Sequence, residues 1–77
     1  MVTIADLKKG ETGIIKDFID DYFPIKLLDL GCLPGSVVEI VQVAPLNDPI
    51  YINVDGSHIA IRRSTASKIE LYLLKVM

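Results

Sequence analysis

The sequence predicts a mainly β domain: a small, partly open barrel of the SH3 type, with about five strands and one short α-helix between the first and second strands. Runs of β-branched and aromatic residues recur along the chain, separated by Gly, Pro, Asn and Asp, as strands separated by turns require. Helical spacing of apolar residues occurs in one short stretch. A chain of 77 residues is too short for two packed sheets. We therefore expect residues 1–77 to form a single domain with a thin core, in which roughly 60% of the unfolded chain's surface is buried.

The start of the chain predicts a lead-in followed by a strand. Ile4 and Leu7 are placed to pack beneath the domain, and Gly10 allows the backbone to turn after them. Residues 12–19 are rich in β-branched and aromatic side chains and predict the first strand. Because apolar residues occupy both faces of this strand, it is either buried on both sides or bent by a bulge.

Residues 22–30 predict the helix. Asp20 or Asp21 can cap it, and Pro24 suits its first turn, where the missing N–H does no harm. Gly31 is expected to end the helix in the left-handed conformation. The helical spacing produces one buried stripe and one side that faces water. The stripe consists of Phe23, Leu27 and Leu30, and the water-facing side of Lys26 and Asp29.

Residues 36–44 follow a turn at Pro34-Gly35 and predict the longest strand. Val38 and Ile40 form its inward set. The other face has more apolar side chains than a solvated strand face needs. These are Val37, Val41 and Val43, beside Glu39. Two explanations stay open: a partner covers this face, which would also support weak self-association, or the chain's own helix or terminal segments cover it.

Residues 50–61 predict a β-hairpin around a two-residue type I′ turn at Asp55-Gly56. The turn sets the register. On the buried side we expect the pairs Val54 with Ser57, Ile52 with Ile59, and Ile50 with Ile61. The other side carries Tyr51, Asn53, His58 and Ala60. Residues 64–67 then predict a single helical turn, and residues 69–73 a closing strand. In that strand Ile69, Leu71 and Leu73 alternate with Glu70 and Tyr72.

Composition argues against several classes of protein. The net charge of -2 and the pI near 5.1 count against broad nucleic-acid binding, because a protein that binds a polyanion usually carries a basic stripe. Only Arg62-Arg63 is locally basic. Apolar residues come in runs of four or fewer, far below the roughly 20 that a membrane-spanning helix needs. No export signal is visible and a single cysteine cannot form an internal disulfide, so we expect a cytoplasmic protein.

The residues that could carry chemistry are few and scattered. A nucleophilic enzyme needs a nucleophile, a base and an orienting group in reach of one another, and this chain has one Cys and one His. Cys32 is expected to be buried and inert, and His58 to be solvated rather than a metal ligand. Asp17, Asp20 and Asp21 could share a hard cation, but calcium requires about six oxygens or more, so a solvated acidic loop explains them better. We predict no catalytic residue, no cofactor and no metal site.

The order and spacing of turn and strand-end residues match a known pattern over nearly the whole chain. The pattern comprises Leu7, Gly10 and Gly13, then Leu27, Leu30, Gly31, Pro34 and Gly35, then Ala44, Pro45, Asp48, Pro49 and Ile50, then Gly56, and then Ala60, Ile61, Arg62, Arg63 and Ala66. In these residues the chain resembles the bacterial ferrous iron transport protein A family (FeoA-like). The glycines and prolines stand where the backbone turns, so they support the fold rather than a site. Cys32, where the family more often has a larger apolar residue, is a departure, as is the segment 20–23.

The resemblance implies a small cytosolic SH3-like barrel that accompanies a large inner-membrane ferrous iron permease with a cytosolic GTPase domain. It carries over no catalytic or iron-ligating residue. We therefore expect an accessory protein of bacterial ferrous iron uptake, which docks to the permease and its GTPase domain, binds no nucleic acid and does not insert into the membrane. Two alternatives stay open. One is a free-standing SH3-like module related to the C-terminal domain of metal-dependent repressors, and the other is a nucleic-acid-associated small barrel.

The expected docking surface is formed by the helix and by the loop from Pro45 to Pro49. Recognition usually occurs on loops held by a rigid scaffold, and the two prolines reduce the entropy lost when this loop is immobilised. The residues expected to take part are Lys26 and Leu28 of the helix and Leu46 and Asp48 of the loop. Leu46 is either exposed at the loop tip or folded back over the barrel. The next candidate surface is the apolar face at Val37 and Val41.

Overall fold

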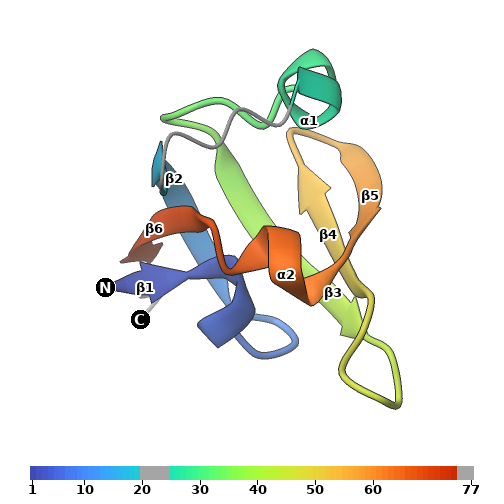
Figure 1. The fold of residues 1–77 in the computed structure, drawn as a ribbon. Coiled ribbons are helices and arrows are strands. Elements are labelled where there is room, and N and C mark those ends of the chain that lie inside the picture. Colours follow the sequence, from blue (N-terminus) through green and yellow to red (C-terminus); the bar gives the residue numbers. More distant parts are fainter. Residues whose placement is uncertain (20–24, 75–77) are drawn as a thin grey trace.

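The structure of the chain is a computed structural model, which describes residues 1–19 and 25–74. Within these ranges six strands form one curled antiparallel sheet in the order β1-β6-β2-β3-β4-β5 (Figure 1). The elements in chain order are β1 (Val2–Thr3), the 3₁₀ helix η1 (Ile4–Asp6), β2 (Thr12–Phe18), α1 (Ile25–Asp29), β3 (Val37–Val43), β4 (Ile50–Val54), β5 (Ser57–Ile61), α2 (Arg63–Ala66) and β6 (Ile69–Leu74). The predicted mainly β fold is confirmed, with α1 between the first two long strands. Because β1 and β5 are the two edges, the sheet is open.

β1 was not predicted from the sequence. With it, the described residues have six strands, where about five were expected. This strand has two residues, and Val2 lies opposite Leu71 of β6 while Thr3 lies opposite Glu70. Two residues are too few to show the alternation of faces by which a strand is recognised. The strand leads into η1, where the Asp6 carboxylate accepts hydrogen bonds from the Thr3 backbone N–H at 2.9 Å and from its hydroxyl at 3.2 Å.

The core is one cluster of buried side chains that draws on every long strand and both ends of the chain. It consists of Ile4, Leu7, Ile15, Leu27, Cys32, Val38, Ile40, Ile50, Ile52, Val54, Ile61, Ala66, Ile69 and Leu71. The predicted packing of Ile4 and Leu7 beneath the domain is confirmed, since their side chains are 0% and 5% exposed. Aliphatic residues fill the core, and burial of each such side chain contributes about 1.5–3 kcal/mol.

A bulge explains why apolar residues occupy both faces of β2. The register against β6 shifts between Ile15 and Asp17, which leaves Lys16 as the extra residue. Ile15 is buried before the shift and Phe18 packs against the core after it, although the two differ in parity. One of the two predicted explanations is therefore confirmed. Lys16 lies outside, where its Nζ is 3.5 Å from the Glu70 carboxylate and 5.3 Å from the centroid of the Tyr72 ring.

A second bulge corrects the faces predicted for β3. The predicted inward residues Val38 and Ile40 are fully buried. The register against β4 then shifts between Ile40 and Gln42, so that Val43 lies opposite Ile50 and packs against the core. The prediction that Val43 shares the outer face with Glu39 is wrong, because one extra residue exchanges the two faces of a strand.

The described part of the helix is shorter than predicted. Residues 20–24 lie outside the described residues. Three predictions fall there: the cap at Asp20 or Asp21, Pro24 in the first turn, and the burial of Phe23. Leu27 is buried in the core as predicted, and Lys26 and Asp29 are exposed. Leu30, predicted to be buried, is 47% exposed. The helix ends at Asp29, so Leu30 belongs to the turn that leads to Gly31, whose φ of 95° confirms the predicted left-handed cap.

The hairpin of β4 and β5 has the predicted register at all three predicted pairs. Asp55 and Gly56 both have positive φ, 50° and 88°, as a type I′ turn requires. The predicted helical turn is α2, one residue earlier than expected. The predicted closing strand is β6. Of its alternating residues, Ile69 and Leu71 are buried, while Leu73 is 43% exposed and lies opposite Gly13, which has no side chain to cover it.

The family pattern predicted a turn at Gly13, but the structure explains the glycine in a different way. Its φ is not in the left-handed region, and it is buried within the pairing of β2 with β6, where it lies opposite Leu73. A Cβ at this position would lie 3.0 Å from Leu71 Cδ1 and 3.0 Å from the Tyr72 carbonyl oxygen. The close approach of β6, rather than a turn, therefore requires a residue without a side chain.

Replacing Gly13 by Ala should lower the free energy of unfolding by about 1–3 kcal/mol, because the backbone oxygen cannot move aside without breaking the β2–β6 ladder. Chemical denaturation monitored by circular dichroism measures the change. Thr12→Ala, one residue earlier in the same strand, is the control and should lower it by less than about 1 kcal/mol. Equal losses in the two variants would contradict the close-approach explanation.

Candidate binding site

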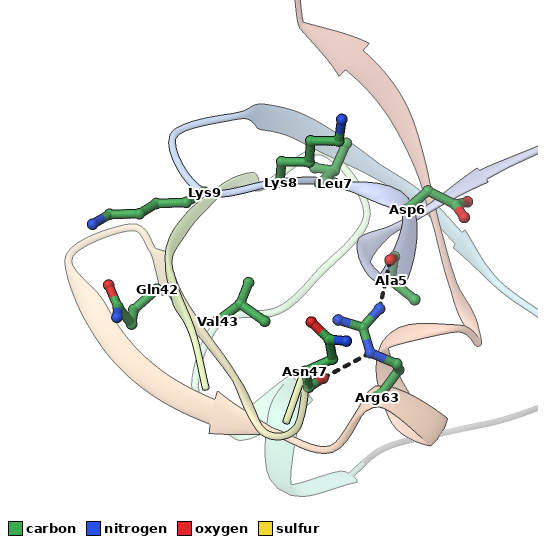
Figure 2. A pocket seen from close by; sticks show the side chains of 9 residues that line it. All are labelled: Ala5, Asp6, Leu7, Lys8, Lys9, Gln42, Val43, Asn47 and Arg63. Atoms are coloured by element: carbon green, nitrogen blue, oxygen red, sulfur yellow. Dashed lines mark hydrogen bonds between the residues drawn. The ribbon is translucent and has the colours of Figure 1, made fainter. Parts of the chain in front are cut away.

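A cleft of about 570 Å³ lies at one end of the sheet, between the segment 5–9 and the end of β3 with the loop after it (Figure 2). Its lining residues are Ala5, Asp6, Leu7, Lys8, Lys9, Gln42, Val43, Asn47 and Arg63. These residues come from η1, from the turn before β2, from β3, from the β3–β4 loop and from α2. The cleft is therefore built where several connections meet, which is where binding residues usually lie on a rigid scaffold.

Arg63 joins the walls of this cleft. Its Nη1 donates a hydrogen bond to the Ala5 carbonyl at 2.8 Å and its Nε donates to the Asn47 carbonyl at 2.7 Å (Figure 2). Its backbone N–H donates to the Asp48 carboxylate at 3.0 Å. A single residue thus connects η1, the β3–β4 loop and the start of α2. Asp48, predicted as a docking residue, holds the loop in place through this bond.

Lys8 and Lys9 form a positive rim on the opposite side of the cleft. Both are exposed. Their turn is held by the Lys8 N–H, which donates to the Glu11 carboxylate at 2.6 Å, and by the Gly10 N–H, which donates to the Ile40 carbonyl at 2.8 Å. Gly10 has a φ of 89°, so the predicted turn is confirmed. Two ammonium groups on a fixed turn favour an anionic group in or beside the cleft.

The loop between β3 and β4 presents one large apolar side chain to solvent. Leu46 is 89% exposed, so the alternative in which it folds back over the barrel is wrong. The loop is closed by hydrogen bonds from Asn47 N–H to the Ala44 carbonyl at 2.8 Å and from Ala44 N–H to the Pro49 carbonyl at 3.1 Å. Leu46 therefore stands on a defined loop, next in sequence to the cleft residue Asn47.

The structure does not bring the predicted helix and loop together in one groove. α1 precedes β3 and the loop follows it, and they lie at opposite ends of this strand (Figure 1). Seven residues of strand span about 20 Å. Lys26 is exposed and Leu28 half-buried at the α1 end, while Leu46 and Asp48 lie at the cleft end. Two separate surfaces replace the single surface that was expected.

The structure also separates Val37 from Val41. Val37 is 44% exposed and lies opposite Ile14, which in turn lies opposite Tyr72, so these three form an apolar row across β3, β2 and β6. Val41 is the extra residue of the β3 bulge and is half-buried. It lines a second hollow, of about 390 Å³, beside β4 and β5.

The residues considered for chemistry lie apart from the cleft. Cys32 is fully buried, and this burial, together with the negative charge of Asp55, raises the pKa of its thiol. His58 is exposed on β5. Asp17 is exposed and accepts a hydrogen bond from the Phe18 N–H at 2.7 Å, while Asp20 and Asp21 fall outside the described residues. In residues 1–19 and 25–74, no three or more His, Cys, Asp and Glu side chains are grouped so as to hold a metal ion.

Sequence reasoning missed the cleft residues Lys8, Lys9 and Arg63. Two lysines directly before a turn glycine were an available signal for a charged rim. Arg63 had no such signal, because its partners lie 58 and 16 residues away along the chain.

The class of the protein follows from its fold, and solved structures support it. The FeoA of Stenotrophomonas maltophilia, complexed with zinc and described as a procaryotic SH3 domain protein, matches with a TM-score of 0.77 at 21% identity. The match covers 92% of this chain and 89% of that one, and at this identity it shows the fold alone. The chain therefore has the SH3-like fold that its sequence predicted.

The particular family is shown by sequence. Residues 2–73 match the family model of the FeoA domain, so the chain belongs to the FeoA domain family, as the resemblance indicated. The solved FeoA protein of Chlorobium tepidum has a TM-score of 0.87 at 28% identity, with 96% of this chain and 71% of that one covered.

One curated relative is much longer. It is the Fe(2+) transport protein A/Fe(2+) transporter FeoB fusion protein of Porphyromonas gingivalis, 36% identical over 72 residues. The match covers 92% of this chain but only 8% of that relative. The family is therefore one involved in Fe(2+) transport. None of the helices in the described part of this chain is long and apolar enough to cross a membrane.

Replacing Arg63 by Lys should lower the free energy of unfolding by about 1–2 kcal/mol, because one ammonium cannot donate to the Ala5 and Asn47 carbonyls in the geometry of the guanidinium. Denaturant titration measures it. Arg62→Lys is the control: Arg62 is exposed, its side chain makes no hydrogen bond within the described residues, and the same substitution there should be close to neutral. If both variants are as stable as the parent, Arg63 does not hold the cleft together.

Proposed function

We propose that this chain is an accessory protein of ferrous iron uptake that acts in the cytoplasm by docking onto the membrane Fe(2+) transporter. The observation that carries this proposal is the fusion relative, in which a segment similar to this chain is part of one polypeptide with FeoB. Joining two domains keeps each at a high effective concentration near the other, which is useful when they work in contact. Contact between the two domains requires a binding surface on the domain that resembles this chain.

Docking without chemistry is the role that the described residues support. The thiol of Cys32 has no exposed surface and a raised pKa, so it is a poor nucleophile. The imidazole of His58 is exposed on β5, a different element from the turn that carries Cys32. No hydrogen bond joins the Cys32 thiol to the His58 imidazole within the described residues, so the two do not form a nucleophile and base pair here.

We place the docking surface at the cleft, extended by Leu46. The positive rim of Lys8 and Lys9 on one side and the apolar tip of Leu46 on the other suit a partner segment that carries acidic residues and an apolar anchor. The hydrogen bonds of Arg63 hold the walls before the partner arrives, which reduces the ordering that binding requires. Of the other residues expected to take part, Lys26, Leu28 and Val37 define the competing surface at the α1 end, whereas Val41 lines the separate hollow beside β4 and β5.

The two alternative functions are less well supported. The FeoA domain match and the fusion relative favour transport over a repressor module. The net charge of -2 disfavours a nucleic-acid barrel, since three cations around one cleft neutralise few phosphates. Filter binding to RNA at low salt should show essentially no retention, and strong retention that falls with salt would favour the nucleic-acid alternative.

Replacing Lys9 by Glu, or Leu46 by Asp, should weaken binding to the purified cytosolic GTPase domain of a FeoB-type transporter by about tenfold each. The first change reverses a charge of the positive rim, and the second removes the apolar side chain at the loop tip. Isothermal titration calorimetry measures the dissociation constant. Lys26→Glu makes the same charge change as Lys9→Glu at the α1 end and should leave the constant within about twofold. All three residues are exposed, so thermal unfolding should be similar in every variant.

If the order of the dissociation constants of these variants is reversed, the docking surface lies elsewhere. If Lys26→Glu weakens binding and the two cleft variants do not, the docking surface is the α1 end of the sheet. If the parent chain binds neither the GTPase domain nor the full-length transporter in detergent, docking is wrong as the mode of action.

A further inference from the structure

β5 forms an edge of the sheet, and among residues 1–19 and 25–74 no other strand lies on the side of it away from β4 (Figure 1). In a two-residue hairpin the residues next to the turn, Val54 and Ser57, form a hydrogen-bonded pair, and such pairs then alternate. His58 and Ala60 fall between these pairs, so their N–H and C=O groups point away from β4. These four groups have no hydrogen-bond partner within the described residues.

This edge lacks the features by which proteins usually prevent strands from pairing at a free edge. β5 contains no Lys, Arg, Asp, Glu or Pro, and its five pairs with β4 follow one another without a bulge. The other edge is different: β1 has only two residues and passes directly into η1. β5 is therefore the edge at which an added strand would find the longest regular template.

A hollow beside this edge adds a place for a side chain. It has a volume of about 390 Å³ and is lined by Val41, Gln42, Tyr51, Ile52, His58, Ile59 and Ala60. Tyr51 lies opposite Ala60 on the outer face and is 41% exposed, and the small Ala60 leaves the space beside its ring open. A strand added antiparallel to β5 would place the side chain opposite Ala60 over this hollow.

The charges at the two ends of β5 indicate what the added strand is. Asp55 is exposed just before the strand and Arg62 is exposed just after it. When two copies of β5 pair antiparallel about a twofold axis at Ile59, His58 of each copy lies opposite Ala60 of the other. The same arrangement brings Arg62 of each copy beside Asp55 of the other, so opposite charges meet at both ends of the pairing.

We propose that two copies of this chain associate edge to edge through β5, with His58 of each copy seated over the hollow beside Ala60 of the other. The four outward groups of each edge then supply main-chain hydrogen bonds, and the Asp55–Arg62 pairs set the antiparallel register. An edge of five residues buries far less than the 1,200 Å² or so of a standard interface, so the dimer is transient. This surface, and not the row at Val37, is the site of self-association.

Sedimentation equilibrium of the purified full chain, together with amide spectra recorded at protein concentrations from about 20 μM to about 1 mM, tests the proposal. The amide signals of His58 and Ala60 should move with concentration, and those of Val37 and Ile14 should not. Ala60→Pro removes only an outward N–H, because a proline is tolerated on an edge strand where its nitrogen faces solvent. This variant should stay monomeric throughout.

Arg62→Glu tests the register without changing the backbone. It places two like charges together at both ends of the paired strands and should weaken self-association by about tenfold. Lys26→Glu has the same net charge and should associate as the parent does. The proposal is overturned if Arg62→Glu associates as strongly as Lys26→Glu, if the concentration-dependent shifts appear at Val37 rather than at β5, or if the parent stays monomeric at about 1 mM. Should Ala60→Pro not fold, the comparison of Arg62→Glu with Lys26→Glu decides by itself.

Discussion

One extra residue in β3 determines which side chains of this central strand face the core and which face the two candidate surfaces. β3 is the strand that pairs with both β2 and β4, and the bulge at Val41 exchanges its two faces partway along. Before the bulge Val38 and Ile40 belong to the buried core, and after it the partly buried Val43 packs against that core. Gln42, which lies between Val41 and Val43, is exposed and lines both the cleft and the hollow beside β5. The core and both candidate surfaces therefore depend on the same local irregularity.

The sequence predicted best those parts of the fold that are determined locally. The β4–β5 hairpin was predicted completely, because the Asp55-Gly56 turn admits one register and that register assigns every face. The faces of β3 beyond Ile40 were not predicted, because the sequence of this strand does not show that Val41 is an extra residue, and one extra residue exchanges the faces beyond it. The exposure of Leu30 was missed for a related reason: helical spacing alone does not say where the helix stops.

The candidate site was the part least accessible from the sequence. For Leu46 the sequence left two alternatives, exposed at the loop tip or folded back over the barrel, and the structure shows the first. The loop was assigned the wrong neighbour, because which connections meet in space depends on strand order and on the direction of β3. Arg63 closes the cleft through contacts that are distant along the chain, and such contacts leave no periodic trace.

Recognition of a transporter through the cleft can be tested residue by residue in this FeoA family member. The most direct measurement is an amide shift titration of the isotope-labelled chain with the unlabelled cytosolic GTPase domain of a FeoB-type transporter. We predict the largest shifts in residues 5–9 and 42–47 and at Arg63, reduced by added salt because the rim is basic. Shifts centred on residues 26–33, or no shifts at a saturating concentration of the GTPase domain, would contradict recognition through the cleft.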